Sequence, residues 1–167
     1  MASHSGFSLL LFFIQKYFCK NEKNRENACR KGASHMKRSK INAIIKDFEK
    51  KLAEYRFALP PYLSFTPEEW AEKGHEYDEI RDNELGWDVT DYGEGDYDNR
   101  GLALITIRNG NTKNPKYTKV YAEKIMMLYP GQLSPNHFHW NKMEDIIDRG
   151  GGELHFRLWN ANRDNEG

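Results

Sequence analysis

The sequence has few cysteines, no excess of charge of either sign and no long hydrophobic segment. Its two cysteines, Cys19 and Cys29, both lie among the first 35 of the 167 residues. The rest of the chain is therefore not a disulfide-stabilised scaffold, and a reducing cytoplasm is its expected location. The 25 basic and 25 acidic residues give a formal net charge of zero. This balance argues against a nucleic acid or an anionic membrane as partner.

The most apolar stretch of the chain, residues 9–14, is too short to cross a bilayer, which takes about 20 apolar residues. A signal peptide carries basic residues ahead of its apolar core, and residues 1–5 contain neither lysine nor arginine. The letters GASHM at residues 32–36 resemble a cloning scar before a start at Met36. We therefore expect residues 1–35 to be a leader or non-native extension, disordered or irregular, whose removal leaves the fold unchanged. A targeting segment is the alternative.

Two helices are predicted shortly after residue 35. Apolar residues recur at helical spacing over residues 36–54, which predicts an amphipathic helix that Ser39 can cap. Thr66, Pro67 and Glu69 form the pattern of a capping box with proline at the first helical position. This pattern predicts a second helix that begins at Pro67.

Short strands are predicted in the second half of the chain. β-Branched and alternating residues favour strands within 102–108, 117–129 and 153–160, with Gly, Pro and Asn turn signals between them. Residues 87–97 are rich in acidic and aromatic residues, and we interpret them as a surface turn region. Short strands separated by turns predict an all-β barrel or a jelly roll.

A possible metal site lies in the sequence H-x-H-x4-E, formed by His137, His139 and Glu144. Side chains alternate across a strand, so two histidines at i and i+2 would point to the same face. Trp140 and Asn141 are a plausible two-residue turn, after which Glu144 would supply a third ligand from the next strand.

The ligand set contains two imidazoles and one carboxylate and no thiolate. Such a set suits Mn, Fe, Co, Ni or Zn, and three protein ligands leave positions open for water or substrate. Lys142 stands two positions before Glu144. It is the candidate catalytic residue, because a lysine there can donate to a substrate oxygen or move a proton. A solvent-exposed lysine is the alternative.

The amino-acid sequence around these residues resembles that of a known family. The spacing G-x5-H-x-H-x4-E-x6-G, from Gly131 to Gly151, resembles the first motif of the cupin superfamily. The resemblance to the D-lyxose isomerase family runs from Met36 to the end of the chain. It implies a mainly β domain over residues 36–167, a cupin-type jelly-roll barrel with N-terminal helices. The similar stretches are PNHFHWNKMEDIIDRGGG at 135–152, LGWDVTDYG at 85–93, LITIRNG at 104–110 and YAEKIM at 121–126.

The resemblance also implies a reaction, the interconversion of D-lyxose and D-xylulose through an enediol. The expected partners are a pentose substrate and a second copy of the chain. We expect Mn²⁺ at the site, with Zn²⁺, Co²⁺, Fe²⁺ and Ni²⁺ as alternatives. Cupins also carry a second motif with a further histidine ligand, which has no counterpart here, so we expect a barrel incomplete on its C-terminal side. The alternatives are a non-catalytic metal- or sugar-binding cupin, an inactive fragment and a cupin dioxygenase.

Overall fold

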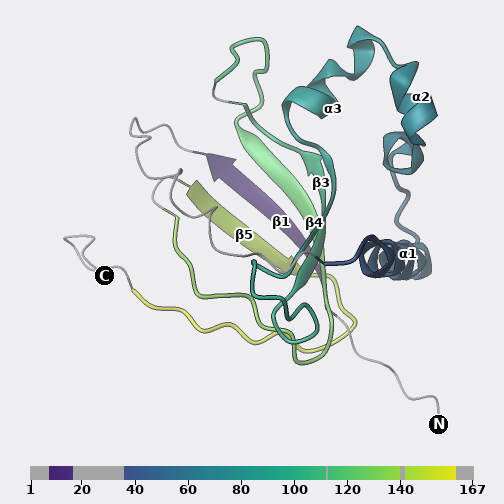
Figure 1. Cartoon of the computed structure of the whole chain (residues 1–167). Helices are drawn as coiled ribbons and strands as arrows, with labels where there is room; N and C mark the ends of the chain where they lie inside the picture. Colours follow the sequence, from purple (N-terminus) through teal and green to yellow (C-terminus); the bar gives the residue numbers. More distant parts are fainter. Residues whose placement is uncertain (1–7, 17–35, 112, 140–141, 161–167) are drawn as a thin grey trace.

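A computed structural model describes residues 8–16, 36–111, 113–139 and 142–160 of the chain. Five antiparallel strands form one sheet in the order β2-β3-β4-β1-β5 (Figure 1). The strands are β1 (Ser8–Lys16), β2 (Gly86–Thr90), β3 (Leu102–Arg108), β4 (Tyr121–Leu128) and β5 (Lys142–Asp148). The helices are α1 (Arg38–Glu54), α2 (Pro67–Ala71) and α3 (Asp78–Asp82), with short 3-10 helices η1 (Pro61–Ser64) and η2 (His75–Tyr77).

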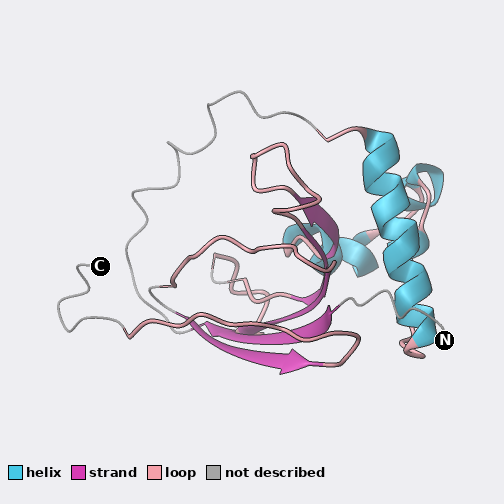
Figure 2. Cartoon of the chain, turned by 90° about the horizontal axis from the view of Figure 1, so that it is seen from below, coloured by secondary structure: helices cyan, strands magenta, loops and turns pink. Residues whose placement is uncertain are grey.

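The hydrophobic core lies between α1 and the strands β3 and β4. Ile44, Phe48 and Leu52 follow one another at intervals of four residues, so they share one side of α1, and all three are buried. They pack with a cluster that includes Ile105 of β3 and Met127 of β4. Figure 2 shows α1 along one side of the sheet. The predicted amphipathic helix is thus confirmed.

The helix caps agree with the sequence in one case and differ in the other. Thr66 accepts a hydrogen bond from the amide of Glu69 at 3.2 Å, and the Glu69 carboxylate accepts one from the amide of Thr66 at 2.7 Å. The predicted capping box of α2 is therefore confirmed, with Pro67 in the first turn. At α1 the capping position is Lys37, which makes no side-chain cap, so the expectation for Ser39 was wrong.

The strand predictions are confirmed for β3, for β4 and for β5, the strand that carries Glu144, and two other predictions are wrong. Residues 86–90 form β2 rather than a turn region, because Trp87 and Val89 pack against the core and so extend the sheet. Residues 153–160 belong to no strand, and Phe156 and Trp159 are exposed. An alternating pattern produces a strand only where a neighbouring strand supplies hydrogen-bonding partners.

The N-terminal segment differs most from expectation. Ser8–Lys16 forms β1, which lies between β4 and β5 and pairs with both (Figure 1). The expectation of irregular structure was therefore wrong for these residues, because backbone groups of an internal strand find partners on both sides. Residues 1–7 and 17–35 lie outside the described residues. The division into a leader over 1–35 and a domain over 36–167 stays a prediction.

The sheet is open at both ends in the part of the chain that the structure describes. β2 and β5 are its edge strands, and no pairing between them closes a barrel. The β-rich architecture with N-terminal helices agrees with the sequence, whereas the jelly-roll barrel stays a prediction.

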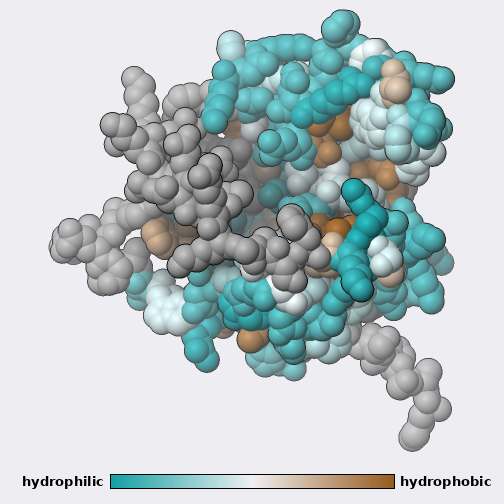
Figure 3. Space-filling model, in the orientation of Figure 1, coloured by the Kyte–Doolittle hydropathy of each residue, from teal (hydrophilic) through white to brown (hydrophobic). Residues whose placement is uncertain are grey.

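No helix within the described ranges is long and apolar enough to cross a membrane. On the face seen in Figure 3, hydrophobic side chains show mainly toward the middle, with hydrophilic ones around them.

The buried Tyr97 makes folding sensitive to alkaline pH. Burial, with a further contribution from the carboxylates of Asp98 and Asp47, raises the pKa of Tyr97 from 10.0 to about 12. A raised pKa means that the folded protein holds the phenol proton more tightly than the unfolded chain. This contribution to stability is complete below about pH 10 and is lost as the pH rises toward 12.

We predict that Tyr97→Phe reduces the loss of unfolding free energy between pH 9 and about pH 11, because the replaced ring has no proton to lose. Urea unfolding at a series of pH values measures this loss. The reduction should be partial, since burial and the nearby Asp47 also raise the pKa of Tyr129. An unchanged pH dependence would contradict the prediction.

Candidate metal centre

The structure brings three metal-binding side chains together on the segment that follows β4 and on β5. The ligand atoms of His137, His139 and Glu144 all lie within 4.8 Å of one another. His139 Nε2 and Glu144 Oε1 lie 3.1 Å apart. The two imidazole rings lie edge to face, with 4.9 Å between their centroids. The cluster is partly exposed, so small molecules can reach it.

The histidines do not reach the cluster in the way the sequence predicted. His137 and His139 lie in the irregular segment 132–139, not on a strand, and their rings meet at 73°. The alternation of a strand therefore does not align them, and that expectation was wrong. Glu144 is on a strand, β5. The predicted turn at residues 140–141 lies outside the described residues.

Side chains from other parts of the chain anchor the segment that carries the histidines. The Tyr129 hydroxyl donates a hydrogen bond to the Asp47 carboxylate of α1. Gln132 is buried, and its side chain donates to the carbonyl oxygen of Tyr97 at 2.6 Å and accepts from the amide of Tyr129 at 2.8 Å. The segment is thus attached to the core just before the histidines. Two more anchors are Leu133 N with Asn99 O, at 2.8 Å, and the Tyr92 and Ser134 hydroxyls, at 3.0 Å.

A backbone contact selects the tautomer of His137. Its Nδ1 lies 2.9 Å from the carbonyl oxygen of Pro135. A carbonyl oxygen only accepts, so Nδ1 carries the proton and donates. In a neutral imidazole this leaves the lone pair on Nε2, which is the arrangement that a metal-binding histidine needs.

The cluster fits a divalent ion. Metal–ligand bonds of about 2.0–2.2 Å place neighbouring ligand atoms roughly 3–3.5 Å apart. His139 and Glu144 already have this spacing at 3.1 Å, and all three ligand atoms lie within 4.8 Å of one another. Two imidazoles and a carboxylate suit Mn²⁺, Fe²⁺, Co²⁺, Ni²⁺ or Zn²⁺. Metal binding by these residues stays a prediction.

The register of the sheet places Glu144 on the face away from α1. Glu144 pairs with Ile14, which in turn pairs with Ala122 of β4. Ile125 and Met127 have the opposite parity along β4 and belong to the core cluster with α1. Because side chains alternate across a strand, Glu144 falls on the other face. Helix α1 and Glu144 therefore lie on opposite faces of the sheet.

The structure gives less detail for the predicted catalytic lysine. Lys142 is the first residue of β5, two positions before Glu144. Its side chain lies outside the part of the chain that the structure describes, so its catalytic role stays a prediction.

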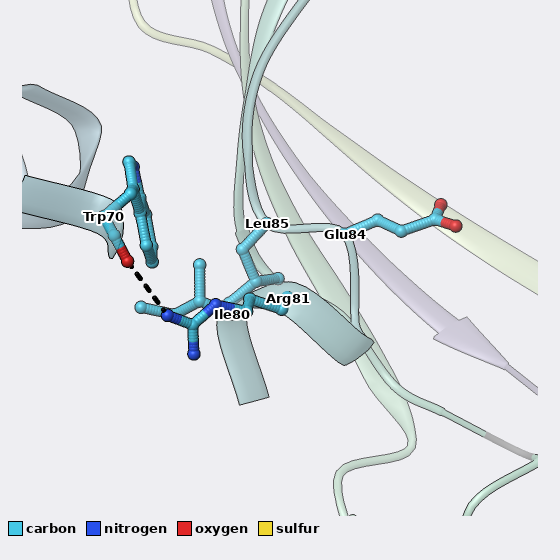
Figure 4. A pocket seen from close by; sticks show the side chains of 5 residues that line it. All are labelled: Trp70, Ile80, Arg81, Glu84 and Leu85. Carbon is cyan, nitrogen blue, oxygen red and sulfur yellow. Dashed lines mark hydrogen bonds between the residues drawn. The ribbon is translucent and has the colours of Figure 1, made fainter. Parts of the chain in front are cut away.

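A hollow of about 390 Å³ lies beside α2 and α3, away from the candidate metal ligands (Figure 4). The guanidinium of Arg81 donates to the carbonyl oxygens of Trp70 at 3.4 Å, Lys73 at 2.8 Å and Gly74 at 3.0 Å. Arg81 thereby ties α3 to the end of α2, which is a structural role. The lining residues are Trp70, Ile80, Arg81, Glu84 and Leu85, and none of the three candidate metal ligands is among them.

A family model and two known proteins that are similar to this chain all carry the name D-lyxose isomerase or D-lyxose/D-mannose isomerase. The sequence model of a family described as D-lyxose isomerase matches residues 36–167. A D-lyxose/D-mannose isomerase of Escherichia coli O157:H7 is 46% identical over 127 residues, which are 75% of this chain and 56% of that protein. A D-lyxose/D-mannose isomerase of Serratia proteamaculans is 44% identical over 127 residues, again 75% of this chain and 56% of that protein. The chain thus spans little more than half the length of these curated relatives.

Loss of one candidate ligand should weaken metal binding. We predict that His139→Ala lowers the affinity for Mn²⁺ at least about tenfold, because the ion loses an imidazole and Glu144 loses its neighbour. Isothermal titration calorimetry measures the affinity. The matched control is His155→Ala, since His155 is exposed and its ion pair is with Glu153, 3.4 Å away. Equal weakening by both substitutions would contradict the assignment.

Proposed function

Because the chain belongs to the D-lyxose isomerase family, we propose that its His-His-Glu cluster serves a metal-dependent interconversion of D-lyxose and D-xylulose. The observation that carries the proposal is the convergence of His137, His139 and Glu144 within the family region. The relatives are also named for D-mannose. D-Mannose and D-lyxose share their configuration next to the aldehyde, so an aldose of that configuration is the proposed substrate class. Because the chain spans 56% of the relatives' length, the reaction is proposed for the whole protein.

The reaction is redox-neutral and moves two protons. The proton on C2 of the open-chain aldose leaves and a proton arrives at C1, while the hydroxyl proton of O2 is lost and one is gained at O1. A divalent ion in this site supplies a Lewis acid for the carbonyl and the adjacent hydroxyl oxygen. His137 and His139 bind in neutral form, and the Glu144 carboxylate offsets part of the ion's charge.

Lys142 is the proposed catalytic residue of this chain. An ammonium group near the sugar can donate to the oxygen on which negative charge develops, and it can return a proton later. Its place in β5, two positions from Glu144, supports this assignment. Mn²⁺ as the bound ion, a cytoplasmic location and assembly of two copies are further proposals from the sequence.

We expect the chain, joined to the part of the Escherichia coli relative that it does not span and loaded with Mn²⁺, to convert D-lyxose into D-xylulose. Removing the metal with a chelator should abolish turnover, and adding Mn²⁺ should restore it, because the Lewis acid returns. Chromatographic separation of the two pentoses follows the reaction. Pentose binding without conversion would favour a binding protein, and a turnover that requires O₂ would favour a dioxygenase; either result would overturn the proposal.

Replacement of the lysine should separate catalysis from metal binding. In the joined protein we predict that Lys142→Ala lowers turnover by about 10²–10⁴-fold while the bound Mn²⁺ stays close to one ion per chain. Elemental analysis and initial rates on the same preparation measure both quantities. Lys119→Ala is the control, because Lys119 forms an ion pair with Glu79 of α3. Unchanged turnover in Lys142→Ala would make Lys142 a surface lysine.

A further inference from the structure

Strand β5, which carries Glu144, depends on β1 for its place in the sheet. β5 pairs with β1 from Lys142 to Asp148 and, among the described residues, with no other strand. β1 in turn pairs with β4 over its whole length except for Lys16 (Figure 1). The connection from β5 to the core of the sheet therefore runs through β1.

The described side chains of β5 add nothing to the hydrophobic core. Met143 is 58% exposed, and Ile146 and Ile147 are each 38% exposed. The core cluster takes its described members from α1, β3, β4 and Tyr97, and β5 supplies none. Among the described interactions, backbone hydrogen bonds to β1 connect this strand to the rest of the sheet.

The register connects this dependence to the metal ligands. Ile14 stands opposite Glu144 on one side and opposite Ala122 on the other. With about 4.7–4.9 Å between neighbouring strands, Ile14 sets both the distance and the register of Glu144 relative to β4. The histidines are held separately, through Tyr129 and Gln132. The 3.1 Å approach of His139 and Glu144 therefore joins a segment anchored by side chains to a strand anchored by backbone pairing.

We infer that Ser8–Lys16 is a positioning strand for the metal centre, which holds Glu144 within reach of the two histidines. The inference rests on the metal-binding function proposed above. It concerns a segment outside the region that matches the family, residues 36–167. It also reverses the expectation from sequence that the first 35 residues are dispensable.

The test uses the full chain with Ile14→Pro. Proline lacks the amide hydrogen and does not fit an internal strand. Ile14→Val is the matched control, because valine keeps the backbone donor and a β-branched side chain. Amide hydrogen exchange, followed by mass spectrometry, reports the pairing of β5 in the absence of metal. We expect faster exchange at residues 143–148 in the proline variant, unchanged exchange in the valine variant, and retained protection in α1 and β3.

Titration with Mn²⁺ supplies the second measurement. We expect the affinity of the proline variant to fall on the order of tenfold, as for other losses of ligand support, and that of the valine variant to match the parent. Unprotected β5 amides in the parent, or protection and affinity that Ile14→Pro leaves unchanged, would overturn the inference. If the parent bound no Mn²⁺, the proposed function would fail, and the exchange of β5 alone would decide whether β1 positions Glu144.

Discussion

The packing of α1 against β3 and β4 is the interaction on which the rest of the structure depends. Phe48 and Leu52 are fully buried in it, together with Ile105 and Met127 from the sheet. Burial of side chains of this size stabilises a fold by roughly 1.5–3 kcal/mol each. The contact occupies one face of the sheet, and Glu144 of the candidate metal centre falls on the opposite face.

The candidate metal centre is attached to this core by two kinds of hydrogen bond. The histidine segment is attached through side chains, with Tyr129 bound to Asp47 of α1 and Gln132 bound to Tyr97. The Glu144 strand is attached through backbone pairing, by way of β1. Loss of either attachment should therefore move one part of the site relative to the other. The affinity for a metal ion would then depend both on the side-chain anchors of the histidine segment and on the pairing of β5 with β1.

Features with a strong local cause were predictable from the sequence. The capping box at Thr66 and Glu69 lies in four consecutive residues, and its two hydrogen bonds form as expected. Strand β3 combines alternation with β-branched residues, and its bounds agree with the prediction. Residues 153–160 have a similar pattern and form no strand, because pairing depends on a neighbour that the pattern itself does not contain. The anchors Asp47 and Gln132 were missed, since no local signal connects residues so far apart in the chain.

The sequence by itself determined which side chains form the candidate metal site and which family the chain resembles, because the types and spacing of His137, His139 and Glu144 are properties of the chain. Only the tertiary structure decided how they meet. The histidines approach from an irregular segment rather than a strand, and Glu144 is placed by β1, a segment that composition alone had marked as irregular. The physical reason is that a strand forms only beside another segment whose backbone can hydrogen-bond to it, and the fold decides which distant segments become neighbours.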